Sequence, residues 1–169
     1  MNAKQARPTL DFDAFLESFP VVELPVTLST DLAVTFSKRN DPLSGLAVRQ
    51  YIDLAENDSP DDEYTEYVAC FRIPDTFEFQ AVVYWRAGLM DYQYILATYD
   101  KHGNSLDRAT LAGTNSDGNS VTESVAVFED DWVIRVVTGT RTAGGKFDPG
   151  NSSVAYLELL PDGRIKRGR

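Results

Sequence analysis

Short apolar runs alternate with compact turn signals from Tyr67 to the C-terminus. The turns are rich in Gly, Asp, Asn and Pro, which favour tight reversals of the backbone. They fall at residues 73–75, 101–104, 115–119, 130–131 and 161–163. Short turns join antiparallel neighbours, because parallel strands need a long crossover connection. The pattern therefore predicts an antiparallel β-meander.

The apolar runs between these turns are the predicted strands, and their centres recur about every 10 to 14 residues, a spacing typical of sandwiches and barrels. The predicted strands cover 67–73, 77–86, 92–99, 105–112, 120–128, 132–140 and 152–160, with a short final strand after 161–163. Residues 77–86 and 92–99 are apolar on both faces, which is typical of central strands covered on both sides. Trp85 and Trp132 lie within apolar runs, so we expect both to be buried.

A helix is predicted near the N-terminus, where large apolar residues recur at the spacing of one helix face. These residues are Phe12, Phe15, Leu16 and Phe19. Thr9 or Asp11 is a suitable N-cap, and Pro20 ends the helix. Three phenylalanines on so short a helix need a large apolar surface, so we expect the helix to cover one face of the sheet.

The segment between this helix and the meander gives weaker signals. Pro25 interrupts residues 21–28, so a strand there belongs at a sheet edge or breaks at the proline. Leu32, Val34 and Phe36 share one face of an extended chain over residues 32–36, which is the pattern of a short strand. Residues 42–56 fit a helix that starts at the Asp-Pro pair 41–42, and they fit a strand nearly as well. We favour the helix because of the segment's length and its Asp-Pro start.

These elements predict the organisation of the whole chain. Residues 1–8 are a flexible arm, 9–66 a helix-containing N-terminal part and 67–169 the β-meander. The acidic segment 57–66 is an exposed loop that is too short to separate two domains. We expect 1–169 to form a single domain, since this length buries a substantial core. The fold class is mainly β, or α+β by strict count: about six to eight antiparallel strands in a sandwich or curled sheet, with one or two N-terminal helices packed on it.

Charge and composition narrow the partners that the protein can have. The net charge of −10 repels nucleic acid and anionic membranes and attracts basic partners. No apolar stretch reaches the roughly 18 residues of a membrane-spanning helix, and residues 1–8 lack the apolar core of a signal peptide. Cys70 is the single cysteine and is expected to be a buried structural thiol. The lack of a disulfide favours the cytoplasm, and a mature secreted or periplasmic form is the alternative.

The sequence contains no catalytic motif. His102 lies in a Lys-His-Gly-Asn turn whose geometry accounts for each residue. Residues 115–119 fall short of an EF-hand calcium loop, because Glu123 lies one residue before the position of the bidentate carboxylate. The acidic pairs 61–62 and 130–131 lie in turns, which do not supply the separation across a cleft that catalytic carboxylates need. We therefore expect no enzymatic activity, no metal and no cofactor.

The candidate partner-binding residues are aromatic and acidic. Aromatic residues gather on the strands 77–86 and 92–99, and Tyr, Trp and Arg are frequent anchors of protein interfaces. We predict that an exposed patch includes some of Tyr84, Arg86, Tyr92 and Tyr94. Acidic loops are expected to attract a basic partner. The candidates are Asp61, Asp62, Glu63, Asp130 and Asp131.

Together these features favour a non-enzymatic protein-binding module, such as an acidic immunity or inhibitor protein that neutralises a bacterial toxin or another basic partner. The first alternative is a small-ligand carrier, in which a β-barrel-like sheet encloses an apolar pocket. The second alternative is an enzyme that uses carboxylates. The leading hypothesis rests on small size, high acidity and the lack of a catalytic motif, which such inhibitors share.

Overall fold

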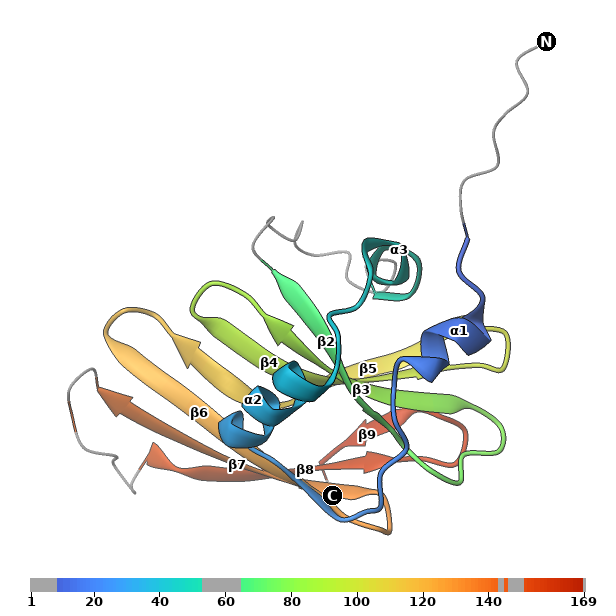
Figure 1. The fold of residues 1–169 in the computed structure, drawn as a ribbon. Coiled ribbons are helices and arrows are strands. Elements are labelled where there is room, and N and C mark those ends of the chain that lie inside the picture. Colours follow the sequence, from blue (N-terminus) through green and yellow to red (C-terminus); the bar gives the residue numbers. More distant parts are fainter. Residues whose placement is uncertain (1–8, 53–64, 143–144, 146–150, 169) are drawn as a thin grey trace.

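One antiparallel sheet dominates the computed structural model, which describes residues 9–52, 65–142, 145 and 151–168 (Figure 1). In these residues nine strands form the sheet, and eight of them follow one another in sequence order. These eight are β2 (Glu66–Arg72), β3 (Gln80–Ala87), β4 (Asp91–Tyr99), β5 (Ser105–Ser116), β6 (Ser120–Phe128), β7 (Val133–Thr142), β8 (Ser153–Leu159) and β9 (Ile165–Arg167). The remaining strand, β1 (Val26–Leu28), pairs with β6. The predicted antiparallel meander is thus confirmed, and its sheet does not close into a barrel.

Short helices precede the meander. They are α1 (Phe12–Glu17), α2 (Thr30–Arg39), α3 (Gly45–Ala47) and the π-helix η1 (Val48–Ile52). No helix in the described segments is both long enough and apolar enough to cross a membrane.

The predicted strand at 32–36 is wrong, because this segment lies inside α2. The Ser29 hydroxyl accepts a hydrogen bond from the Leu32 N–H at 3.3 Å and so caps the first turn of the helix. Leu32 and Phe36 are four residues apart, so they lie on one helix face and pack on the core. Val34, between them, is 49% exposed.

The favoured helix at 42–56 is confirmed for α3 and η1, with a different start. The Ser44 hydroxyl accepts a hydrogen bond from the Ala47 N–H at 3.1 Å, so Ser44 is the N-cap. The Asp-Pro pair does not begin the helix, because Pro42 forms an isolated β-bridge with Val68. Residues 53–56 lie outside the described residues.

Two apolar clusters lie on opposite faces of the sheet. Ala81, Val83 and Trp85 of β3 belong to the larger cluster, which also includes residues of α2 and of β6 to β9. Val82 and Tyr84 of the same strand belong to the smaller cluster, which includes residues of α1 and η1. Alternate side chains of a strand point to opposite faces, so β3 is covered on both sides, as predicted.

The N-terminal helix docks on the sheet as predicted. Phe15 and Phe19 are 0% and 1% exposed. The Phe15 ring stacks on Tyr51 of η1 with ring centroids 4.5 Å apart. The Tyr99 hydroxyl of β4 donates a hydrogen bond to the Tyr51 carbonyl at 2.8 Å, which ties η1 to the sheet. Asp11 occupies the N-cap position, but its side chain makes no capping hydrogen bond.

The strands β5 and β6 separate after a short paired stretch, and this separation shapes one end of the molecule (Figure 1). β5 pairs with β4 along most of its length but with β6 only over 113–116. β1 instead pairs with β6 at 126–128. At the other end of β5, the Ile165 N–H of β9 donates to the Asp107 carboxylate at 2.8 Å. The sheet therefore curls around the larger cluster.

The two tryptophans differ in burial. Trp85 is 5% exposed, as predicted. Trp132 is only half-buried, because it lies in the turn before β7 with a φ of 68° and packs at the edge of the core. Its ring meets Phe79 edge-on at a centroid distance of 5.9 Å.

Cys70 is buried, as predicted, and is expected to be unreactive in the folded protein. It is 0% exposed, and burial raises the pKa of its thiol far above the ordinary value. The thiolate is the reactive form, so a disulfide reagent such as Ellman's should label no thiol in native protein. The same reagent should label the one cysteine per chain after denaturation. Labelling of native protein at the rate of a free thiol would contradict this prediction.

Candidate functional site

Tyr84 and Tyr94, two of the predicted partner-binding residues, lie in the core. Each is 0% exposed. Tyr84 packs edge-on against Tyr67 in the smaller cluster. Tyr94 belongs to the larger cluster, and its hydroxyl donates a hydrogen bond to the Ser29 carbonyl at 2.6 Å. The prediction that these two tyrosines contribute to an exposed patch is therefore wrong, because helices cover both faces of this part of the sheet.

Tyr92 and Arg86 do reach the surface. Tyr92 is 41% exposed, and its ring stacks on Trp85 with centroids 6.0 Å apart and an interplanar angle of 14°. Arg86 is half-buried, and its guanidinium lies 3.5 Å from the Asp91 carboxylate. The stack holds the Tyr92 ring in place with one side toward solvent.

The two acidic candidates that the structure describes lie away from Tyr92. Asp130 and Asp131 are exposed in the β6–β7 turn. The opposite end of β6 is the one near Tyr92, because the β5 residue Ser116 donates its N–H to the Met90 carbonyl at 3.0 Å. The nine residues of β6 span roughly 26 Å, so the two aspartates and Tyr92 do not form one patch. Three further candidates lie outside the described residues: Asp61, Asp62 and Glu63.

An apolar groove lies between α2 and the β3–β4 hairpin. It has a volume of about 400 Å³, and its lining includes Val34, Lys38, Trp85 and Tyr92. Val34 faces it from the helix, and the Trp85–Tyr92 stack faces it from the sheet. The Lys38 stem adds apolar surface while its ammonium stays in water. The groove thus joins an exposed helix residue to an exposed aromatic ring.

The tip of the β3–β4 hairpin extends this apolar surface. Gly88 donates its N–H to the Asp91 carbonyl at 2.9 Å and so closes the turn. Leu89 and Met90, at the tip, are 78% and 48% exposed. Turn tips are usually polar, and a group of exposed apolar residues on a protein surface marks an interaction site. We call the groove together with Leu89 and Met90 the Tyr92 surface.

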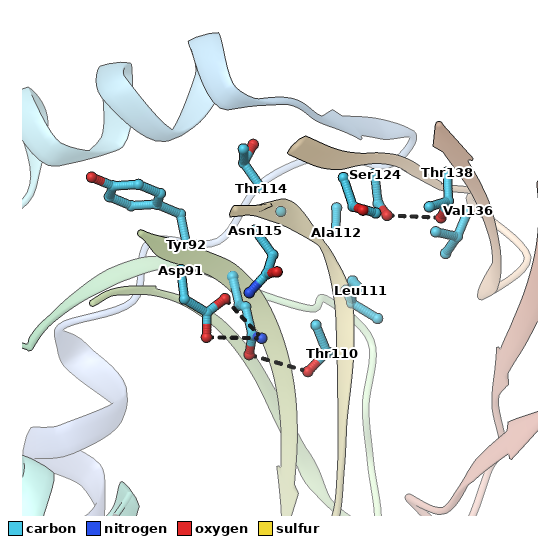
Figure 2. Close-up of a pocket in the computed structure, with 13 residues that line it drawn as sticks. Asp91, Tyr92, Thr110, Leu111, Ala112, Thr114, Asn115, Ser124, Val136 and Thr138 are labelled. Atoms are coloured by element: carbon cyan, nitrogen blue, oxygen red, sulfur yellow. Dashed lines mark hydrogen bonds between the residues drawn. The ribbon is translucent and has the colours of Figure 1, made fainter. Parts of the chain in front are cut away.

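A hollow of mixed polar and apolar lining adjoins the Tyr92 surface where β5 and β6 begin to separate (Figure 2). Its volume is about 270 Å³, and Tyr92 lines both it and the groove. Gly113 lies in the middle of a row of paired residues, between Gln93 of β4 and Ser124 of β6. The row therefore has no side chain at Gly113, where a Cβ would lie 1.9 Å from the backbone carbonyl oxygen of Tyr92. We call this site the Gly113 hollow.

Hydrogen-bonding groups line part of the Gly113 hollow, beside the apolar residues Leu111, Ala112 and Val136. The Ser124 and Thr138 hydroxyls are 2.7 Å apart, and the Gln93 amide donates to the Asp91 carboxylate at 3.2 Å (Figure 2). The Arg86 guanidinium also faces Asp91, which offsets the charge of this carboxylate. The hollow can therefore accept and donate hydrogen bonds to a polar group of a partner.

The turn residues that the sequence analysis interpreted as structural have structural roles. His102 is exposed, and its backbone N–H donates to the Asp100 carboxylate at 2.8 Å. In the β5–β6 turn the Asp117 carboxylate accepts the N–H groups of Ser120 and Asn119, and these bonds lower the pKa of Asp117. Among the described residues no group of three His, Cys, Asp or Glu side chains is placed to hold a metal ion.

The site combines residues that sequence reasoning found with others that it missed. Tyr92 and Arg86 were predicted. Val34 was missed because its segment was interpreted as a strand, and Leu89 and Met90 were missed as turn residues. Two adjacent apolar residues in the turn after Gly88 were the available signal. No protein-family model, curated protein or solved structure matches this chain.

Proposed function

We propose that this protein is a non-enzymatic binding module that holds another protein through the Tyr92 surface. The observation that carries the proposal is the grouping of exposed apolar residues at one end of the molecule. Val34, Leu89, Met90 and Tyr92 are 49%, 78%, 48% and 41% exposed. The stacked Tyr92 ring loses little conformational freedom when it is covered, which makes it a favourable anchor.

The partner that suits this surface is a basic protein with a projecting apolar side chain. The apolar side chain would enter the groove, and a neighbouring polar group would bind in the Gly113 hollow. Three carboxylates lie at this end of the described residues: Asp31 of α2, Glu66 of β2 and Asp117 of the β5–β6 turn. Asp91 is paired with Arg86, and Lys38 lines the groove. With the net charge of −10 the three carboxylates attract cations and speed association.

Asp130 and Asp131 have a smaller part in this proposal than the sequence analysis gave them. The roughly 26 Å along β6 exceeds the Debye length of about 8 Å at physiological salt. Their contribution to attraction at the Tyr92 surface is therefore screened. An acidic inhibitor or immunity protein that covers part of a basic toxin would use a surface of this kind.

Affinity capture with matched baits tests the proposal. The test variant replaces both tip residues, Leu89→Ser and Met90→Ser, which removes apolar surface without touching the core. The control is Phe77→Ser, because Phe77 is 80% exposed in the β2–β3 loop, at the far end of β3 from Tyr92. We expect a basic protein to be retained by wild type and by Phe77→Ser and to be lost from the tip variant.

Equal retention of the same protein by all three baits would place its binding site elsewhere and refute the role of the Tyr92 surface. Equal loss of the captured protein from the tip variant and from Phe77→Ser would show that capture depends on exposed apolar area in general and not on the Tyr92 surface. Circular dichroism and the thermal midpoint of each bait verify that the variants are folded.

A further inference from the structure

A second exposed apolar region lies on β6, β7 and β8, on the face that points away from the larger cluster. Val125, Val137 and Val154 are paired residues on these strands, so they form one row across the face. Val137 is 43% exposed and Val154 56% exposed. The neighbouring inward residues Ala126 and Ile134 belong to the core, which fixes the valine row on the opposite side.

Charged residues lie on both sides of this row. Glu123 lies two residues before Val125 on β6, so it is the next side chain on this face, and it pairs with Gly139 of β7. Arg135 lies two residues before Val137 on β7, on the other side of the valine row, and it pairs with Val127 of β6. Both charged side chains are exposed. Strand geometry separates the Cα atoms of Glu123 and Arg135 by roughly 14 Å, too far for a salt bridge within one chain.

A hollow of about 320 Å³ lies on the same face, and its lining includes Glu123, Gly139 and Arg141 together with Val125 and Val137. Gly139 contributes no side chain, so there is space beside the Glu123 carboxylate. The face therefore offers an apolar row, a hollow that carries charges of both signs, and the Arg135 guanidinium at the position across the row that matches Gly139.

We propose that this face binds a second copy of the chain, with a two-fold axis along the valine row. Rotation about this axis puts each valine opposite its own equivalent in the second copy. It also puts Arg135 of each copy over Gly139 of the other, beside Glu123. A two-fold axis makes this contact twice, which is the isologous arrangement of most homodimers. The face thus matches itself at the pairing of Arg135 with Glu123 and in the space at Gly139, and this favours a second copy as its occupant.

The molar mass in solution tests the interface. Sedimentation or light scattering from about 1 to 200 µM, a range that covers micromolar dissociation constants, should give twice the chain mass of 18.8 kDa. Val137→Asp should give the monomer, because the charge would be buried at the centre of the apolar row. Phe77→Ser should leave the dimer intact. A monomeric wild type over the whole range, or a dimer that persists with Val137→Asp, would overturn the proposal.

A charge swap tests the position of the axis. Glu123→Arg and Arg135→Glu should each raise the dimer dissociation constant by about tenfold, because each places like charges together twice. The double variant should return the constant close to the wild-type value, since the pairs re-form with reversed signs. The two residues cannot pair within one chain, so recovery reports contact between copies. A double variant that is as weak as the singles, or weaker, would contradict the proposed axis.

Discussion

Replacing Phe15 with alanine is expected to lower the free energy of unfolding by about 3 to 5 kcal/mol, the usual cost of truncating a buried phenylalanine. Phe15 is fully buried between α1 and the sheet. Its ring lies 4.5 Å from Tyr51, 5.1 Å from Phe19 and 5.7 Å from Tyr99, measured between centroids. The alanine variant leaves a cavity between the rings of Phe19, Tyr51 and Tyr99. These rings cannot easily fill it, because other packing contacts and the Tyr99–Tyr51 hydrogen bond fix their positions.

Urea denaturation measures this cost, with Phe77→Ala as the control. Phe77 is 80% exposed, so its truncation should change the free energy of unfolding by no more than about 0.5 kcal/mol. A typical domain has about 5 to 15 kcal/mol in total, so the Phe15 variant should unfold at a clearly lower urea concentration. A cost for Phe15→Ala below about 1 kcal/mol would mean that α1 contributes little to the folded state.

Replacing Gly113 with alanine should be similarly damaging, for a different reason. Gly113 has a φ of +155°, and a Cβ at this position would lie 1.9 Å from the Tyr92 carbonyl oxygen. That oxygen belongs to the backbone of β4, so the strands β4 and β5 would have to move apart. Backbone strain and overpacking together predict a loss of about 4 kcal/mol.

Gly118→Ala is the matched control for Gly113→Ala. Gly118 also has a positive φ, +92°, but a Cβ there has nothing within 4 Å. The control carries the conformational cost of about 1 to 2 kcal/mol without the collision. Both free energies come from the same urea titration. Equal losses for the two variants would show that the β4–β5 contact at Gly113 tolerates a side chain.

The hairpins were predictable because local chemistry determines them. Aspartate and glycine in the turns fix where the chain reverses, and alternation fixes which residues share a face. The largest difference in a strand boundary is at the end of β5. The predicted strand ends at residue 112, and the structure extends it to Ser116. Residues 113–116 carry no apolar side chain, yet they pair with β6, and residues 113–115 line the open Gly113 hollow.

At residues 32–36 the spacing of apolar residues does not distinguish a strand from a helix. Leu32 and Phe36 are separated by four residues, and this spacing places them on one face of a strand and on one face of a helix alike. The deciding interaction is the cap at Ser29, which lies outside the five-residue window. Length resolves such ambiguity only when the pattern continues over several turns.

The candidate site was predictable only in part, because burial depends on distant segments. Alternation showed that the aromatic residues of these two strands cannot all face the same way, but it did not show which of them the helices cover. Tyr84 packs in the smaller cluster with α1 and η1, whereas Tyr92 lies on the opposite face, beside Val34 of α2. No local pattern in β3 or β4 contains this information.

The central claim, that a protein partner binds the Tyr92 surface, is tested most directly by the dissociation rate of the captured complex. Surface plasmon resonance compares wild type, Tyr92→Ala and the control Phe77→Ala against the same partner. Loss of an anchoring aromatic residue costs about 2 kcal/mol or more, which corresponds to an off-rate at least roughly 30 times faster. We expect this increase for Tyr92→Ala and an unchanged off-rate for Phe77→Ala. Indistinguishable off-rates for wild type and Tyr92→Ala would contradict the account.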